Sequence, residues 1–358
     1  MKIKYIASFD GLRGVAVMLL MLVHGSYGIF GGGVPRVDLF YIMSGFLITY
    51  LLHNEFLSTG RIAIGKFYGR RALRIFPALI VCIILSNLLW TYTELTPGHN
   101  QTLATVSSLF FFNNIVFETA LGNMNHLWSL SVEEHFYLVW PVITFFILFR
   151  LSHANRIIFL SALIVGVEIF RIIAFQNQDQ WRYGIFWIDP YGFTLCRIDC
   201  ILVGALLFLV LYRGKYNYGT LRSSSYDNLL LIGLAVIFLT SALTIKLVDP
   251  RWLNGGFIIS NILCACTVFL AIKNPNHPVL AHKALVWIGR RSYGIYLYHM
   301  PIFLYMERFR VHDSYTNFII VTFFRFAISI AFAALSYQYI ERPILEYKNR
   351  LKLKYNYK

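Results

Sequence analysis

The sequence predicts an all-α polytopic integral membrane protein, with about ten transmembrane helices and both termini in the cytoplasm. Of its 358 residues, 58% are apolar and only 14% are charged, whereas soluble domains carry about 25% charged residues. The apolar runs nearly free of charge reach the roughly 20 residues that a helix needs to cross the hydrocarbon core. These observations exclude a soluble domain, a disordered chain and a secreted disulfide scaffold.

Ten apolar runs are long enough to cross. We expect the spanning helices at residues 11–30, 37–53, 72–91, 127–149, 156–175, 191–212, 228–247, 253–272, 284–306 and 317–340. A further apolar stretch, 102–118, is short and is interrupted by Asn113, Asn114 and Glu118. We expect that stretch not to cross fully.

The distribution of Lys and Arg sets the orientation, because cytoplasmic loops are enriched in positive charge. With ten crossings and a cytoplasmic N-terminus, 22 of these residues fall on the cytoplasmic side, six outside and four within spans. If 102–118 crossed, every later loop would change sides and the asymmetry would disappear. The net charge of +15 is therefore interpreted as contact with anionic lipid headgroups rather than with nucleic acid.

The chain is expected to hold one membrane domain, residues 1–345, followed by a basic cytoplasmic tail, residues 346–358. No small-residue cleavage site follows the first span, so we expect a retained helix rather than a signal peptide. All five cysteines lie in apolar runs without metal-finger spacing, which predicts free, buried thiols.

Arg13 and His24 lie inside the first predicted span, eleven residues apart. Eleven residues return a helix to within about 20° of its starting direction, so both side chains project from one face, about 16 Å apart along the axis. Ionisable groups in a span are functional candidates, and a neutral histidine can act as a general base. The alternative is a histidine bonded to a neighbouring helix.

A basic cluster marks the cytoplasmic start of the third span. Arg71 and Arg74 share a helix face at i,i+3, and planar guanidinium groups bind phosphate oxygens in pairs. The cluster suits a polyphosphate ligand, although positive residues at this position also anchor topology.

Two adjacent carboxylates, Glu133 and Glu134, lie in the outer half of the span at 127–149. Ser131 shares a face with Glu134 at i,i+3. Glu134 could orient a histidine or a substrate hydroxyl; a buried ion pair with an arginine such as Arg197 is the alternative.

Four more polar residues lie within spans, and polar contacts between helices are the competing explanation for each. They are Asp38, Arg197, Asp199 and His299. Arg197 and Asp199 are two residues apart and cannot face each other on a helix, so each needs a partner elsewhere.

The charged groups of the spans are polarised across the membrane. Arginines gather at the cytoplasmic end: Arg13, Arg71, Arg74 and Arg290. Acid and base groups gather in the outer half: His24, Asp38, Glu133, Glu134 and His299. This polarity fits an anionic donor from the cytoplasm and an acceptor from outside. The outer loop 176–190 adds aromatic residues that suit either sugar stacking or an interfacial belt.

Six segments, in this order, resemble the membrane-bound acyltransferase family three, the O-antigen acetylase group, over roughly residues 8–345. They are Phe9-Asp-Gly-Leu-Arg-Gly with His24, Val37-Asp-Leu-Phe-Tyr-Ile-Met-Ser-Gly-Phe-Leu-Ile-Thr, Phe67-Tyr-Gly-Arg-Arg-Ala-Leu-Arg-Ile-Phe-Pro, His126-Leu-Trp-Ser-Leu-Ser-Val-Glu-Glu, Trp287-Ile-Gly-Arg-Arg-Ser-Tyr-Gly-Ile-Tyr-Leu-Tyr-His and Tyr339-Ile-Glu-Arg-Pro. The chain departs from the family at Arg36, Gly69 and His135.

The resemblance implies transfer of an acyl group, usually acetyl from acetyl-CoA, to a hydroxyl of a cell-surface polysaccharide or lipid-linked sugar such as the lipopolysaccharide O-antigen. Its motifs fall on Arg13 with His24, on Arg71 with Arg74, and on Ser131 with Glu134.

From the residues and the resemblance together, we expect three roles. His24, Glu134 and Asp38 are catalytic; Arg13, Arg71 and Arg74 bind acyl-CoA; Ser131, Glu133, Arg197 and His299 bind the carbohydrate acceptor. We expect a multi-pass protein of the bacterial inner membrane, in contact with membrane lipids, with no metal and no nucleic acid. A transporter or flippase of glycan precursors is the alternative, but it predicts paired inverted repeats that the sequence does not show.

Overall fold

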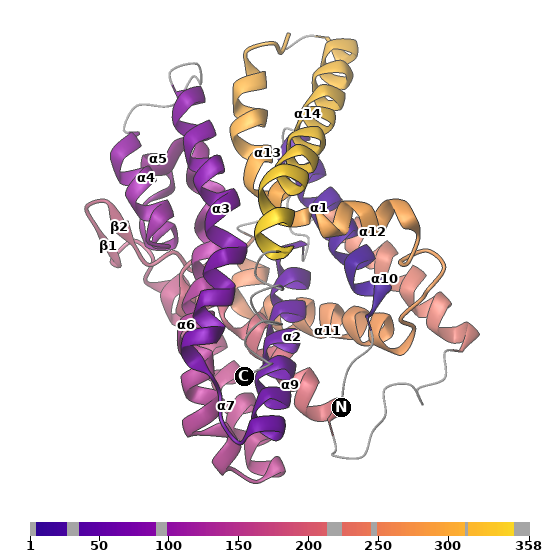
Figure 1. Ribbon diagram of the computed structural model, residues 1–358. Coiled ribbons are helices and arrows are strands. Elements are labelled where there is room, and N and C mark those ends of the chain that lie inside the picture. The colour runs from indigo at the N-terminus through magenta and orange to yellow at the C-terminus, as the bar shows by residue number, and fades with distance from the viewer. Residues whose placement is uncertain are drawn as a thin grey trace. The chain divides into compact units, whose positions relative to one another are not determined.

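The structure is a computed structural model that describes residues 5–26, 36–90, 99–212, 224–244, 249–311 and 314–346. Its regular structure is helical apart from one short hairpin (Figure 1). The chain forms two compact units. Unit 1 comprises Met1–Ile62 and Ser129–Arg290, and unit 2 comprises Ala63–Trp128 and Arg291–Lys358. The predicted basic tail, 346–358, lies outside the described residues from 347 onward.

Unit 1 contains most of the long helices. They are α1 (Ala7–Gly25), α2 (Arg36–Thr59), α6 (Trp128–Phe146), α7 (His153–Gln176), α8 (Thr194–Arg197), α9 (Asp199–Leu211), α10 (Ser225–Thr244), α11 (Phe257–Lys273) and α12 (Lys283–Arg290). A π-helical turn, η5 (Trp252–Gly256), precedes α11, and a short helix, η3 (Leu148–Arg150), follows α6.

Unit 2 is built on three long helices: α3 (Ile64–Trp90), α13 (Ser292–Glu307) and α14 (Tyr315–Ser336). A π-helical turn, η6 (Tyr337–Glu341), follows α14. Four short helices fill the segment between α3 and α6: α4 (Gln101–Leu109), η1 (Asn113–Ile115), α5 (Glu118–Leu121) and η2 (Gly122–Leu127).

Six helical runs among the described residues are long and apolar enough to cross a membrane. They are Ala7–Gly25, Ile64–Trp90, Glu118–Arg150, His153–Gln176, Trp252–Lys273 and Tyr315–Glu346. Asp199–Leu211 and Tyr226–Ser241 are apolar but shorter. The expected α-helical, multi-pass membrane protein is therefore confirmed, while the count of ten crossings and the sides of the termini stay predictions.

The stretch 102–118 forms no continuous helix. Its longest helix, α4, has nine residues, which rise about 14 Å, roughly half of the hydrocarbon core. As expected from its interruptions, this segment cannot cross as a single helix.

Two helices that the sequence predicts as continuous are broken. The expected span 191–212 is divided at Ile198 into α8 and α9. The expected span 284–306 is divided at Arg291, where the backbone leaves helical geometry at φ −105° and ψ 1°. Its first part, α12, belongs to unit 1, and its second part, α13, to unit 2. Hydropathy averaged over a span does not register either break, because the apolar residues on both sides outweigh the charged residues at the break.

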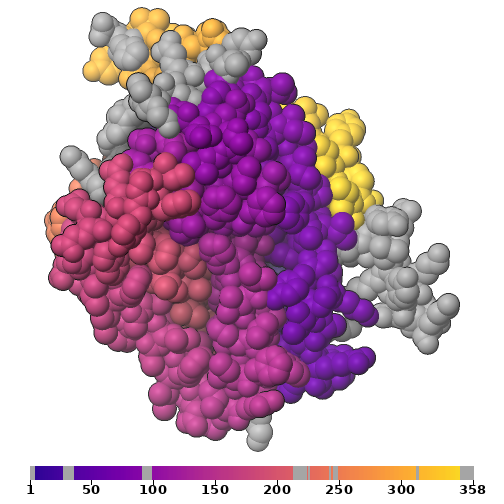
Figure 2. Space-filling view, turned by 90° about the vertical axis from the view of Figure 1, so that its left-hand side faces the viewer, coloured from indigo at the N-terminus to yellow at the C-terminus, as the bar shows by residue number. Residues whose placement is uncertain are grey.

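A short β-hairpin lies within the loop 176–190, which the sequence predicts to be outside the membrane. Strands β1 (Arg182–Tyr183) and β2 (Phe186–Trp187) pair around Gly184, whose φ of +63° suits a residue without a Cβ. Tyr183 and Phe186 are exposed. Figure 2 shows the face on which this segment lies, in the pink shades that mark residues near 180.

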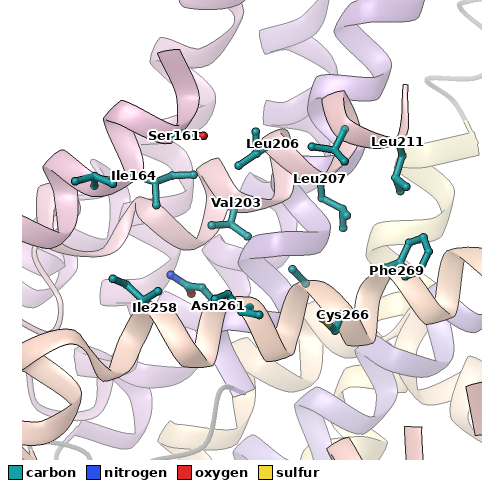
Figure 3. A pocket seen from close by; sticks show the side chains of 14 residues that line it. Ser161, Ile164, Val203, Leu206, Leu207, Leu211, Ile258, Asn261, Cys266 and Phe269 are labelled. Atoms are coloured by element: carbon teal, nitrogen blue, oxygen red, sulfur yellow. The ribbon is translucent and has the colours of Figure 1, made fainter. Parts of the chain in front are cut away.

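All five cysteines are free, as predicted, and four of them are buried. Cys266 is exposed, so its predicted burial was wrong. Cys266 lines an apolar groove of about 560 Å³ between α7, α9 and α11 (Figure 3). Ile164, Leu206 and Ile258 line the same groove. The amide of Asn261 also reaches this groove.

Helices α2 and α9 approach each other through glycine. A Cβ added at Gly204 would collide with the backbone carbonyl of Ile42, and one at Gly45 with the carbonyl of Ile201. Small residues allow such close backbone contact between membrane helices, where van der Waals packing replaces the hydrophobic effect. The close approach of α2 and α9 therefore requires a residue without a Cβ at both Gly45 and Gly204.

Replacing Gly204 with Ala should destabilise the protein, because overpacking of a tight contact costs about 1–3 kcal/mol. Gly166→Ala on α7 is the matched control, since nothing lies within 4 Å of an added Cβ there and Ala stabilises a helix interior by about 0.5–1 kcal/mol relative to Gly. Thermal unfolding of the detergent-purified variants measures both. Equal melting temperatures would contradict the close contact.

Candidate functional site

The predicted site residues are divided between the two units. Seven lie in unit 1: Arg13, His24, Asp38, Ser131, Glu133, Glu134 and Arg197. Three lie in unit 2: Arg71, Arg74 and His299. The predicted catalytic residues, His24, Glu134 and Asp38, are thus all in unit 1.

Arg13 and His24 occupy one uninterrupted helix. Because α1 is continuous from Ala7 to Gly25, the predicted shared face and separation of about 16 Å hold in the structure. His24 lies in the last turn of α1 and is half-buried. Arg13 is also half-buried and forms an ion pair with Asp10, at 3.6 Å between Nη1 and Oδ1.

Asp10 gathers a small polar cluster at the start of α1. It accepts a hydrogen bond of 2.6 Å from the Tyr5 hydroxyl and pairs with Arg290 of α12 at 3.4 Å. Desolvation and the hydrogen bond to Asp10 raise the pKa of Tyr5, so its hydroxyl remains a donor. Two of the four predicted cytoplasmic arginines, Arg13 and Arg290, therefore meet at one carboxylate.

Glu133 on α6 is held against α2. Its Oε1 accepts hydrogen bonds from the hydroxyls of Ser44, at 2.6 Å, and Tyr137, at 2.5 Å. Glu134 is half-buried and Ser131 is fully buried. Since successive helical residues differ by about 100° in direction, Glu133 and Glu134 face different neighbours.

Asp38 and Arg197 form a buried ion pair between α2 and α8. Both are at most 2% exposed. The second oxygen of Asp38 accepts a hydrogen bond of 2.8 Å from Ser260 of α11. Both carboxylate oxygens of Asp38 therefore have partners.

Asp199 has a different set of partners, as the two-residue spacing from Arg197 requires. Its Oδ2 accepts hydrogen bonds from Arg171 of α7, at 3.0 Å, and from Asn261 of α11, at 2.7 Å. Arg171 also pairs with Glu168 one turn earlier. The ring of Phe257 contacts both guanidinium groups. Its centre lies 4.5 Å from Cζ of Arg171 and 4.2 Å from Cζ of Arg197.

These contacts define the buried charge network of unit 1. It consists of Asp38, Glu168, Arg171, Arg197 and Asp199, with Ser260 and Asn261 as neutral partners. Glu168, Arg171 and Asn261 were given no role from the sequence. Two of these three residues could have been found from the sequence, because Glu168 and Arg171 are charged residues at i,i+3 spacing within an apolar run.

In unit 2, His299 is fully buried beside a second histidine that the sequence analysis did not assign. The ring centroids of His299 and His126 are 5.2 Å apart. His299 Nδ1 lies 2.6 Å from the carbonyl oxygen of Tyr296, and His126 Nε2 lies 3.0 Å from that of Leu297. A carbonyl only accepts, so each of these nitrogens carries a proton in the neutral ring.

The donor-binding candidates of unit 2 lie in the second and third turns of α3. Arg71 is half-buried and Arg74 is exposed. Among the described residues, no three His, Cys, Asp or Glu side chains group as a metal site requires. We therefore assign no metal ligands, and the expectation of a metal-free reaction stays a prediction.

Comparison with known proteins identifies the class. Residues 6–337 match the acyltransferase domain family, and the chain belongs to this family, the acyltransferase family three of the sequence analysis. It is 28% identical over 362 residues to an O-acetyltransferase, OatA, of Staphylococcus aureus strain NCTC 8325, and 29% identical over 363 residues to a putative O-acetyltransferase of S. aureus strain COL. These alignments cover 95% and 96% of this chain but only 57% and 58% of the relatives. No solved structure matches.

The Asp38–Arg197 pair should be essential to folding and should couple strongly. Removing one partner leaves a buried unpaired charge, so Asp38→Asn and Arg197→Gln should each destabilise unit 1 by about 3–5 kcal/mol. The double variant should lose less than the sum of the two single losses. Thermal unfolding measures the cycle, with exposed Arg182→Gln as the control; additive losses would show that the pair does not interact.

Proposed function

We propose that this protein is an O-acetyltransferase of the bacterial inner membrane. In this proposal it moves an acetyl group from acetyl-CoA to a hydroxyl of a cell-surface polysaccharide or lipid-linked sugar. The relatives named O-acetyltransferase support the group transferred. The observation that carries the proposal is the fixed placement of Arg13 and His24 on one face of α1, at the positions of the family's arginine–histidine motif.

The donor enters at the arginines. Arg13 of α1 binds a CoA phosphate through charge-assisted hydrogen bonds, and the family's motif assigns the same role to Arg71 and Arg74. From Arg13 the pantetheine arm extends along α1 and presents its thioester near His24. An extended arm explains why the motif separates its arginine and histidine by about 16 Å.

His24 acts as the general base. Its imidazole takes the proton of the acceptor hydroxyl as that oxygen attacks the thioester carbonyl carbon. The carbon–sulfur bond then breaks, the thiolate of CoA leaves, and the imidazolium returns the proton to the thiolate. The products are the O-acetyl ester and CoA. An acyl-histidine intermediate would form the same products in two steps.

Glu134 is the carboxylate that we assign to orienting His24. Glu134 and Asp38 are the two carboxylates among the catalytic residues that the sequence predicts. Asp38 uses one oxygen for Arg197 and the other for Ser260, so its geometry is set by the buried charge network. Ser131, Glu133, Arg197 and His299 remain candidates for contact with the acceptor; of these, Glu133 and Arg197 already have strong internal partners.

His24→Ala should reduce the rate of acetyl transfer by about 10²–10⁴-fold, the contribution of a general base, while leaving donor binding intact. The measurement is thioester turnover by membranes that contain the protein, together with equilibrium binding of coenzyme A. His153→Ala, at an exposed position of α7, is the control. Turnover equal to that of the unaltered protein would remove His24 from the mechanism.

Arg71→Gln and Arg74→Gln should raise KM for acetyl-CoA by about tenfold each, because each removes one charge-assisted phosphate contact. The turnover number should change little, since a phosphate contact is made equally in the ground state and the transition state. Steady-state kinetics with varied acetyl-CoA separate the two constants. An unchanged KM in both variants would refute donor binding at this end of α3.

A further inference from the structure

A second arginine, Arg290 at the end of α12, shares a carboxylate with Arg13 in unit 1. Asp10 forms ion pairs with both: its Oδ1 lies 3.6 Å from Nη1 of Arg13, and its Oδ2 lies 3.4 Å from Nε of Arg290. The two oxygens of one carboxylate thus hold two guanidinium groups from different helices. The proposed mechanism uses Arg13 and gives neither Arg290 nor Asp10 a role.

The position of Arg290 is set by a close contact between the backbones of α12 and α1. A Cβ added at Gly289 would collide with the backbone carbonyl of Asp10, and one at Gly11 with that of Leu280. Glycine permits such an approach because it has no Cβ. Arg290 follows Gly289 directly, so this contact fixes the end of α12 beside the first turn of α1. The two arginines are therefore neighbours because of main-chain packing, and their ion pairs with Asp10 come in addition.

Tyr5 orients the guanidinium group of Arg290. Nη2 of Arg290 donates a hydrogen bond of 2.9 Å to the Tyr5 hydroxyl, which itself donates one of 2.6 Å to Asp10. The guanidinium carbon lies 5.3 Å from the centre of the Tyr5 ring, within the range of a cation–π contact. Asp10 and Tyr5 thus hold a side chain that is 51% exposed. An exposed arginine otherwise samples many rotamers, so this one is preorganised.

Both guanidinium groups keep hydrogen-bond donors for a ligand. Each carries five N–H donors. Arg290 uses Nε for Asp10 and Nη2 for Tyr5. Asp10 is the partner that the described residues give Arg13, and at 3.6 Å their contact is longer than a hydrogen bond. The cluster holds two positive charges and one negative charge, so phosphate oxygens would supply both the missing acceptors and the opposite charge.

Holding α12 against α1 does not account for this cluster. Gly11 and Gly289 are buried and make the close backbone contact, whereas Arg290 is exposed. Exposed ion pairs contribute little to stability, because solvent screens them and the side chains lose entropy. Two preorganised arginines beside one carboxylate are better explained by a bound anion.

We propose that Arg290 binds phosphate together with Arg13 in the donor site, and that Asp10 is the positioning residue of both. Asp10 holds the two guanidinium groups near each other against their mutual repulsion, so that both present donors to one ligand. The ligand chemistry is a phosphate group, from acyl-CoA or from an anionic lipid headgroup. This inference rests on the proposed function, because it extends the donor site at Arg13.

The test measures equilibrium binding of coenzyme A to the whole chain, reconstituted in phosphatidylcholine vesicles, whose headgroups carry no net charge. Arg290→Gln should raise the Kd about tenfold, because it removes a charge-assisted phosphate contact. The loss should shrink in about 1 M salt, where the Debye length falls to about 3 Å. Arg290→Lys should give an intermediate Kd, because an ammonium group cannot bind phosphate bidentately; it also decides the matter if Arg290→Gln fails to fold.

Lys283→Gln is the matched control, since Lys283 is an exposed cation at the opposite end of α12. Its Kd for coenzyme A should not change.

Asp10→Asn tests the positioning role through the ratio of the inhibition constant of inorganic phosphate to the Kd of coenzyme A. The change removes a negative charge, which favours any anion, but it also removes the group that holds the two arginines together. Inorganic phosphate gains from the charge, whereas coenzyme A also loses the paired arrangement. The ratio should therefore fall several-fold, while a merely structural carboxylate would weaken both ligands alike.

An unchanged Kd in Arg290→Gln would overturn the binding of acyl-CoA by Arg290, as would a loss of equal size at low and high salt. An unchanged ratio in Asp10→Asn would remove its positioning role. If Arg290→Gln leaves the Kd unchanged and lowers the melting temperature only in phosphatidylglycerol vesicles, Arg290 binds lipid headgroups. If Arg13→Gln also leaves the Kd unchanged, the proposed donor site at α1 fails; if Arg13→Gln raises it, only the role of Arg290 does.

Discussion

The structure of unit 1 depends on burying ionisable side chains next to partners of opposite charge. An unpaired charge in the bilayer is costly, and three carboxylates and two guanidinium groups from four segments meet in the buried charge network. Asp38 belongs to α2, Arg171 to α7 and Asp199 to α9, and Asn261 of α11 donates a hydrogen bond to Asp199, so each of these helices has a polar contact to another. Apolar packing alone, which is nearly equivalent in every direction in lipid, would not choose these neighbours.

The network also limits where chemistry can occur. A carboxylate with both oxygens bonded to an arginine and a serine has little freedom to orient a catalytic base, so Asp38 is a poorer partner for His24 than Glu134. The same reasoning applies to Arg197, whose guanidinium lies against the ring of Phe257 and within reach of Asp38 and Cys200. The proposed reaction therefore depends on His24 of α1 and Glu134 of α6 rather than on the residues of the network.

The sequence predicted what depends on a single helix and failed where two elements must meet. Hydropathy located the helices because lipid selects apolar runs directly, and the register of Arg13 and His24 followed from helical geometry alone. The spacing of Arg197 and Asp199 showed that each needed a separate partner, but not which one, because interhelical pairs depend on how the helices assemble. The breaks at Ile198 and Arg291 were missed because no proline marks them. Arg290 was grouped with Arg71 and Arg74, although it belongs to unit 1 and pairs there with Asp10.

In unit 1 a single carboxylate, Asp10, forms ion pairs with two arginines, Arg13 and Arg290. A cluster of bare arginines near a membrane surface would attract any phosphate, including those of anionic lipids. A carboxylate among them cancels part of the positive charge, so a monoanion gains little by binding there. A donor with several phosphates gains more, because it engages several guanidinium groups at once. In the proposed donor site, the carboxylate therefore makes the binding affinity depend strongly on the charge of the ligand. It favours acyl-CoA over a single lipid headgroup and still allows CoA to leave after transfer.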